Sequence, residues 1–259
     1  DLKYLKQLGY EPIVVTVAES QASYPVLDPS LIQEVEGIRV IKTATREPLR
    51  WYSRLTSGDS KKGIPQGEVQ TTSIFGKIAA YIRGNFFIPD ARKGWVPFAV
   101  KAEQAVLKQE KMHCLSATGP PHSTHLAGLQ LAKQFQLNWW VDFRDPWLDV
   151  FYNKQFHRSQ SSQAKDAALE KTVLHYASGV ITTTGGDLHQ SLLQKAPDQT
   201  FVALPNGYDA ELMQQTPAAP KKDGFHIVYT GLLTQNQGYS KLVEVLHELS
   251  QSHTFSFTL

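Results

Sequence analysis

Short apolar runs rich in β-branched residues alternate with stretches of helical periodicity along most of the chain. The runs that we expect to form strands are residues 13–18, 37–42, 113–118, 138–143, 179–184 and 200–204. The stretches that we expect to form helices are residues 98–111, 123–136, 162–177 and 186–196. Because strands that alternate with helices form parallel sheets, the pattern predicts an α/β fold in which a parallel sheet carries helices on both faces.

A segment rich in Pro, Ala and Lys, residues 210–224, interrupts this pattern and is typical of a linker. It separates a predicted first domain, residues 1–209, from residues 225–259, where a strand (225–231) and a helix (238–252) indicate the start of a second α/β domain. Residues 1–9 have the pattern of the last turns of a helix that Gly9 ends, and residues 254–259 alternate like a strand. We therefore expect this chain to be a fragment of a longer protein or a truncated copy, with the first strand of the fold missing.

Residues 43–95 do not fit the alternation, and we interpret them as an insert in the first domain. Residues 42–93 contain ten Lys and Arg against four Asp and Glu, so they carry +6 in a chain whose net charge is +2. Aromatic residues, such as Trp51, Tyr81 and Phe86, are interleaved with these charges. Such a surface can lie on an anionic membrane or bind a phosphorylated acceptor. A solvated loop with a few core anchors is the alternative that we favour slightly.

The overall composition excludes several classes of protein. With 259 residues, 41% of them hydrophobic, the chain can bury a sizeable core in one large or two modest domains. Its low net charge gives no strong field for nucleic acid. The single cysteine, Cys114, excludes a disulfide framework and fits the cytosol. The sequence has no apolar run long enough to cross a bilayer, no P-loop, no GxGxxG, no GxSxG and no metal-binding motif, so we expect no metal and no cofactor.

Ligands of parallel sheets bind beyond the carboxyl ends of the strands, and the stretch TGPPHSTH (118–125) follows such an end. Gly119 and two prolines turn the chain, and Ser123 or Thr124 can cap the next helix, whose free N–H groups would then bind a phosphate or a sugar hydroxyl. We expect His122 to hydrogen-bond a ligand. Alternatively, the prolines only stiffen the turn and His122 is a solvated loop residue.

The stretch WWVDFRDPW (139–147) ends another strand with two carboxylates, a guanidinium and an indole. An ion pair of Arg144 with Asp142 or Asp145 would explain the charges structurally, since unpaired charges at a buried strand end are costly. We favour a functional interpretation, in which these groups hydrogen-bond a polyhydroxyl substrate and Trp147 offers its flat face to a sugar ring.

The stretch LPNGYD (204–209) holds the turn pair Asn206-Gly207 just before the predicted linker. After the first strand of the second domain comes TGLLTQNQG (230–238), where Gly231 would let the backbone approach a ligand closely.

Together, FIPDARKGW, TGPPHSTHLAG, WVDFRDPW, LPNGYD and FHIVYTGLL resemble the hallmarks of bacterial glycosyltransferase family 4-like proteins, in matching order over nearly the whole chain. The resemblance implies the GT-B fold, in which two Rossmann-like domains face each other across a cleft. The N-terminal domain binds the acceptor, and the C-terminal domain binds a nucleotide-sugar donor. Members transfer the sugar with retention of configuration and usually need no metal.

Carried to this chain, the resemblance implies that His122 and Asp145 line the cleft near the transferred sugar and that Arg144 orders its wall. These three residues are our predicted catalytic group. The predicted substrate-binding residues are Gly119, Ser123, Asp142, Trp147, Asn206 and Gly207, the last two at the hinge, and Gly231 in the donor phosphate loop.

The resemblance is incomplete in the donor half. Many relatives have an Arg and a Lys just after the position of Gly231, whereas this chain has Gln235, Asn236 and Gln237. We therefore expect a retaining glycosyltransferase for polysaccharide or cell-surface glycan synthesis, using a nucleotide-sugar and a glycan or lipid-linked acceptor, but inactive as this chain alone. We expect it in the cytoplasm, either free or at the inner face of the membrane. The alternatives are a non-catalytic glycan- or partner-binding module and a different Rossmann-type enzyme, such as a dehydrogenase.

Overall fold

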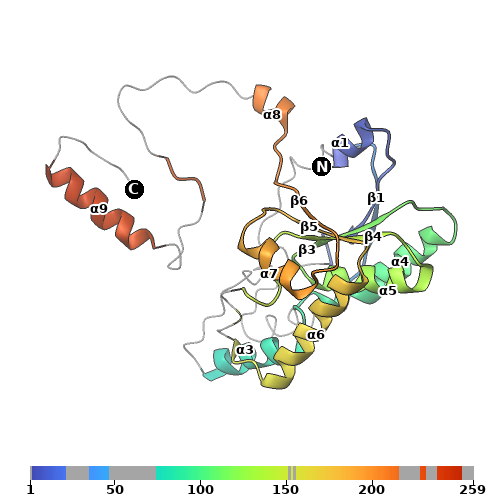
Figure 1. Ribbon diagram of the computed structural model, residues 1–259, viewed down its shortest axis with the longest axis horizontal. Coiled ribbons are helices and arrows are strands. Elements are labelled where there is room, and N and C mark those ends of the chain that lie inside the picture. The colour runs from blue at the N-terminus through green and yellow to red at the C-terminus, as the bar shows by residue number, and fades with distance from the viewer. Residues whose placement is uncertain are drawn as a thin grey trace. The chain divides into compact units, whose positions relative to one another are not determined.

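The structure is a computed structural model that describes residues 2–21, 35–46, 74–150, 153, 156–215, 228–231 and 238–252 (Figure 1). Its contacts divide the chain into two units, Asp1–Tyr208 and Asp209–Leu259, each of which is described by itself. All strands in the described residues belong to the first unit and pair in parallel. The predicted α/β class, with parallel strands flanked by helices, is therefore confirmed.

The parallel strands form two sheets rather than the one that we expected. In the smaller sheet, β1 (Ile13–Val17) pairs with β2 (Arg39–Thr43). The larger sheet contains, in spatial order, β3 (Leu115–Gly119), β4 (Trp139–Phe143), β5 (Gly179–Thr182) and β6 (Phe201–Ala203). The two sheets are distinct because no pairing joins β1 or β2 to β3 within the described part of the chain.

Helices pack against these strands in the first unit. They are α4 (Val96–Leu107), α5 (Ser123–Phe135), α6 (Gln160–Tyr176) and α7 (Asp187–Lys195). Helix α5 contacts β3 and β4 and lies between α4 and α6, while α4 also contacts β1 and β2 (Figure 1). Helix α4 therefore links the two sheets.

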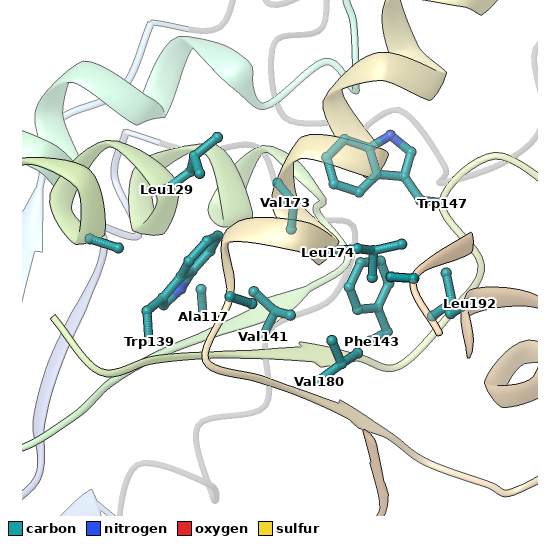
Figure 2. Packing of buried hydrophobic residues seen from close by; sticks show 13 residues of the cluster. Ala117, Leu129, Trp139, Val141, Phe143, Trp147, Val173, Leu174, Val180 and Leu192 are labelled. Atoms are coloured by element: carbon teal, nitrogen blue, oxygen red, sulfur yellow. The ribbon is translucent and has the colours of Figure 1, made fainter. Parts of the chain in front are cut away.

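The main core lies between the larger sheet and helices α5, α6 and α7 (Figure 2). In β4, Trp139, Val141 and Phe143 are fully buried and belong to this core. Because successive side chains of a strand point to opposite faces, Asp142 lies on the other face of the sheet. The alternation thus separates the apolar core from the polar residues that end β4.

Several predicted boundaries shift by a few residues, among them both ends of α4 and the start of β3. Helix α4 begins at Val96 instead of residue 98. Pro97 fits the first turn of this helix because the N–H groups of a first turn form no bond within the helix, so the missing proline N–H costs nothing there. It ends at Leu107 instead of residue 111, where the N–H groups of Gln109 and Glu110 both donate to the Val106 carbonyl. Strand β3 begins at Leu115, two residues later than expected.

The predicted insert, residues 43–95, contains regular structure that we did not predict. Helix α3 (Ile74–Phe86) and a short 3₁₀ helix (Lys93–Trp95) lie within it, and residues 47–73 lie outside the described residues. The Trp95 indole N–H donates to Thr43 Oγ1 at 2.7 Å, and the Arg46 N–H donates to the Gly94 carbonyl at 3.5 Å. The two ends of this region therefore meet at the end of β2.

The second unit contains two described helices, α8 (Ala210–Gln215) and α9 (Tyr239–Ser252). Helix α9 confirms the predicted helix, whereas α8 occupies the start of the segment that we predicted as a linker. Residues 228–231 belong to the predicted strand 225–231 but form no strand. The predicted strand 254–259 lies outside the described residues, and a second Rossmann-like domain stays a prediction. Near the other terminus, α1 (Leu2–Gln7) is followed by Gly9 with φ +84°, as the predicted helix end requires.

Candidate functional site

The turn after β3 is packed against two histidine rings. Gly119 ends the strand, and a Cβ on it would lie 2.6 Å from His125 Nε2 and 3.0 Å from His122 Nδ1. The Gly119 carbonyl accepts a hydrogen bond from the Arg144 N–H at 2.9 Å, which connects this turn to the residue after β4. Gly119 thus makes room for the histidines, a structural role that our prediction of substrate binding did not include.

The N-terminus of α5 is not free for a ligand, which corrects our expectation. Its N-cap position is His122, not Ser123 or Thr124. The Ser123 N–H donates to Asp90 Oδ2 at 2.7 Å, and the Ser123 hydroxyl donates to Asp90 Oδ1 at 2.9 Å. The N–H groups of Thr124 and His125 donate to the carbonyls of Pro121 and His122. The chain's own carboxylate therefore occupies the place predicted for a phosphate or sugar hydroxyl, because a helix N-terminus attracts any anion.

His122 is held inside the protein instead of standing in solvent. Its side chain is 6% exposed, and its Nε2 lies 3.1 Å from the Pro146 carbonyl oxygen. Since a carbonyl only accepts, Nε2 carries the proton and Nδ1 has the lone pair. Burial lowers the pKa of His122 below its ordinary value, although the nearby Asp90 carboxylate opposes the change. His122 is therefore a neutral ring near neutral pH.

Trp147 is 3% exposed, so it does not present a flat face to a sugar ring, which corrects our prediction. Its ring stacks on His122, with 5.1 Å between centroids and 10° between planes. Its indole N–H donates to Asp166 Oδ1 at 2.7 Å. Trp147 fixes the position of His122.

The polar group after β4 is joined to the turn after β6. Arg144 Nε donates to Asp142 Oδ2 at 2.8 Å, and Arg144 Nη1 donates to Asn206 Oδ1. The ion pair that we gave as the structural explanation is therefore present. Asp142 is buried, whereas Asp145 is exposed, so of these two carboxylates only that of Asp145 is open to solvent.

The structure brings together most of the predicted site residues. Arg144 joins several of these residues at the carboxyl ends of β3 and β4. It forms hydrogen bonds with Gly119, Asp142 and Asn206. Gly207 is exposed and has open space around its Cα. Gly231 has φ +140° and lies in the second unit, and Gln235 to Gln237 lie outside the described residues.

Sequence reasoning missed Asp166 and Arg158, two residues that support this site. Asp166 on α6 is 1% exposed and accepts hydrogen bonds from Trp147 and from Arg158 Nη2, the latter at 2.5 Å. Burial raises the pKa of Asp166, while these two donors oppose the increase. The sequence signal for Asp166 was its position on the predicted helix, one turn from Ser162 on one side and one turn from Glu170 on the other. These three residues share the buried face of α6.

A pocket opens beside this group, between the C-terminal turn of α3 and the turn after β3. Its lining includes Arg83, Asp90, Arg92, His122, Trp147 and Arg158. Within the described residues, no three or more His, Cys, Asp or Glu side chains are grouped so that they could hold a metal ion. None of the helices described there is long and apolar enough to cross a membrane.

Comparison with known proteins places the chain in no family. No protein-family model matches the sequence, and no curated protein matches it significantly. Among solved structures, one similar chain is described as a sucrose-phosphate synthase from Thermosynechococcus elongatus. It is 15% identical, has a TM-score of 0.43, and the match covers 81% of this chain and 83% of that chain. A likeness at this level carries no conclusion about activity.

Proposed function

We propose that this chain is part of a retaining glycosyltransferase and that its first unit binds the acceptor of the sugar. The donor would be a nucleotide-sugar, and the product a polysaccharide or another cell-surface glycan. The observation that carries the proposal is the contact of Arg144 with both Asp142 and Asn206, which joins two motifs that lie 62 residues apart. These motifs and the turn at Gly119 are the ones that resemble family 4-like glycosyltransferases.

In the proposed reaction, an acceptor hydroxyl attacks the sugar on the face from which the nucleoside diphosphate leaves. Catalysis would come from positioning the reactants and from stabilising the leaving phosphate, without metal or cofactor. Asp145 is the exposed carboxylate beside Arg144, so it is suited to hold an acceptor hydroxyl. Arg144 would hold this part of the site in place, and the neutral ring of His122, bound to the Pro146 carbonyl, would line it. Residues beyond Tyr208, including Gly231, would contact the donor.

We also propose that the enzyme works in the cytoplasm against the inner face of the membrane, which α3 contacts. Helix α3 presents an apolar row to solvent, Ile78, Tyr81, Ile82 and Phe86, with exposed fractions between 42% and 64%. Its opposite face, with Ala80 and Gly84, is buried. Lys77 is exposed on α3, and the Lys93 ammonium contacts the Phe86 carbonyl. Apolar side chains flanked by cations are typical of surfaces that bind anionic lipid.

The membrane contact can be tested by sedimentation with phosphatidylglycerol vesicles. Ile82→Glu should reduce the bound fraction at least threefold because a charge enters the apolar row. An equal exchange on another exposed surface, Val202→Glu, serves as the control. If Ile82→Glu leaves binding unchanged, the proposed contact is wrong.

The proposed reaction can be tested by calorimetric titration of the chain, and of any longer natural form, with nucleoside diphosphates and their sugars. A nucleotide that binds is then used to measure sugar transfer to glycan and lipid acceptors. Arg144→Gln should lower kcat/KM at least tenfold, whereas Arg39→Gln, on β2, should leave it unchanged. Transfer that is insensitive to Arg144→Gln would contradict the assigned site.

A non-catalytic glycan-binding module is the second candidate, and one observation favours it. Asp90 already occupies the N-terminus of α5, and His122 and Trp147 are engaged with each other. This leaves few open groups for chemistry among the predicted residues. Binding of glycans with no nucleotide bound by either form of the protein would support this candidate over the transferase.

A further inference from the structure

The pocket beside α3 is lined by segments that lie far apart in the sequence. Arg83 comes from α3, Arg92 from the turn that follows it, and Arg158 from the residues before α6. The turn at Pro120 and Pro121 forms another wall. The pocket therefore lies at the carboxyl end of β3, where parallel sheets bind their ligands.

Positive charge exceeds negative charge in this lining. Three arginines line the pocket, against the single acidic lining residue Asp90, and the Asp166 carboxylate behind the lining pairs with Arg158. The Asp90 carboxylate already accepts hydrogen bonds from the N–H groups of Arg92 and Ser123 and from the Ser123 hydroxyl. Its charge is thus directed to the N-terminus of α5.

Two of these guanidiniums, those of Arg158 and Arg83, are positioned by the protein. Arg158 is held by Asp166 at 2.5 Å and by the Gly84 carbonyl at 3.1 Å, and its side chain is 8% exposed. The Arg83 guanidinium lies over the Phe156 ring, 5.0 Å from its centroid. Stacked and hydrogen-bonded guanidiniums lose little entropy when they bind an oxyanion.

The rest of the lining is largely apolar. It includes Phe87, Pro89, Val150 and Phe156. Charges beside apolar walls interact more strongly than charges in water because the local dielectric constant is lower. The arrangement suits a group that combines an oxyanion with an uncharged body.

From these observations we propose that the pocket formed by Arg83, Arg92 and Arg158 binds a phosphate ester. Guanidiniums match the oxygens of phosphate with paired N–H donors, whereas they gain little from a neutral sugar. If the proposed function holds, this phosphate belongs to the acceptor substrate. The binding of the phosphate itself does not depend on that function.

Calorimetric titration of the chain with inorganic phosphate and with glucose 6-phosphate tests the proposal, with glucose as the neutral control. Arg83→Gln combined with Arg92→Gln should weaken glucose 6-phosphate binding at least tenfold. Arg39→Gln removes the same kind of charge from an exposed side chain on β2 and should change the affinity less than twofold. Circular dichroism shows whether each variant is folded. If the double variant does not fold, the single variants Arg83→Gln and Arg92→Gln replace it, and each should weaken glucose 6-phosphate binding at least threefold.

Several outcomes would overturn the proposal. These are absence of phosphate binding, equal weakening by Arg39→Gln, an unchanged affinity in the arginine variants, or tighter binding of glucuronate than of glucose 6-phosphate. Two sources of the ester are distinguished by vesicles of phosphatidylcholine with and without phosphatidic acid. If the phosphatidic acid vesicles compete with glucose 6-phosphate, and this competition is lost in the arginine variants, the pocket binds a lipid phosphate. If these vesicles do not compete, the pocket binds a soluble phosphate ester.

Failure of this proposal can be told apart from failure of the proposed function. Phosphate binding is measured without a nucleotide-sugar, and sugar transfer is measured with Arg144→Gln, which lies outside the pocket lining. Phosphate binding without sugar transfer would support the pocket and contradict the transferase. Sugar transfer without phosphate binding would support the transferase and contradict the pocket.

Discussion

His125 is a titratable residue that lies in the core of the first unit. It is fully buried on α5 and stacks on Phe143, with 4.7 Å between ring centroids. Burial lowers the pKa of His125 well below its ordinary value, and the neighbouring His122 lowers it further, with a partial offset from the Ala117 carbonyl. The folded protein therefore keeps this ring neutral.

Stability should fall in mild acid because of this residue. Below the ordinary histidine pKa of about 6.5, the unfolded chain binds a proton that folded His125 does not. This difference costs about 1 kcal/mol between pH 7.5 and pH 5.5. His125→Leu should remove that loss, as urea unfolding at both pH values would measure.

Comparison with the parent chain is needed because other buried groups also change stability with pH: His122 adds to the loss, whereas Glu103 acts in the opposite sense. Burial raises the pKa of Glu103 to about 7, so folded Glu103 retains a proton that the unfolded chain has lost. Exposed His113 provides the matched control, and His113→Gln should keep the parent's pH dependence. A His125→Leu profile parallel to that of the parent would contradict the neutral assignment.

At the scale of elements, the contact of α5 with β4 depends on a glycine. A Cβ on Gly128 would lie 2.4 Å from Nε1 of Trp139, an indole that is fully buried. Neither the strand nor the helix can yield easily, because both belong to the main core. Gly128 therefore sets how closely the helix approaches the sheet.

Gly128→Ala should destabilise the protein although alanine favours helix. The gain in helix propensity is about 1 kcal/mol, whereas overpacking a core costs about 1–3 kcal/mol. We expect a net loss of about 1 kcal/mol in urea unfolding. Gly207→Ala meets open space and should change stability by less than about 0.5 kcal/mol. Equal stability of the two variants would show that α5 can shift.

Elements with strong local patterns were predictable from the sequence, and long-range contacts were not. Helix α5 and strand β4 were placed to within one residue because their apolar residues repeat at the helical and strand periods. Helix α3 was missed because apolar residues cover both its buried and exposed faces, so it shows no clear polar face. The capping of α5 by Asp90 had no local signal, since 33 residues separate Asp90 from Ser123.

At the scale of the whole molecule, the first unit contains every member of both described hydrophobic clusters. A chain that ends at Tyr208 should therefore keep the urea midpoint of the full chain. A chain that ends at Thr184 loses Leu192 of α7 and Ala196, which follows that helix, both members of the main core, and should not fold. Circular dichroism of both truncated chains would check this, and failure of the first to fold would show that residues after Tyr208 support the core.

The division of the strands into two sheets has a consequence for how the protein opens. Strands β1 and β2 pair with each other, and they contact the rest of the first unit mainly through α4 and through the hydrogen bond of the Trp95 indole with Thr43. The ion pair of Arg39 with Glu110 is exposed and contributes at most about 1 kcal/mol. The two strands can therefore separate from α4 without breaking any backbone hydrogen bond of the larger sheet. Their amide protons should exchange with solvent through a local opening, ahead of those in β4 and β5, which become accessible only when the main core is lost.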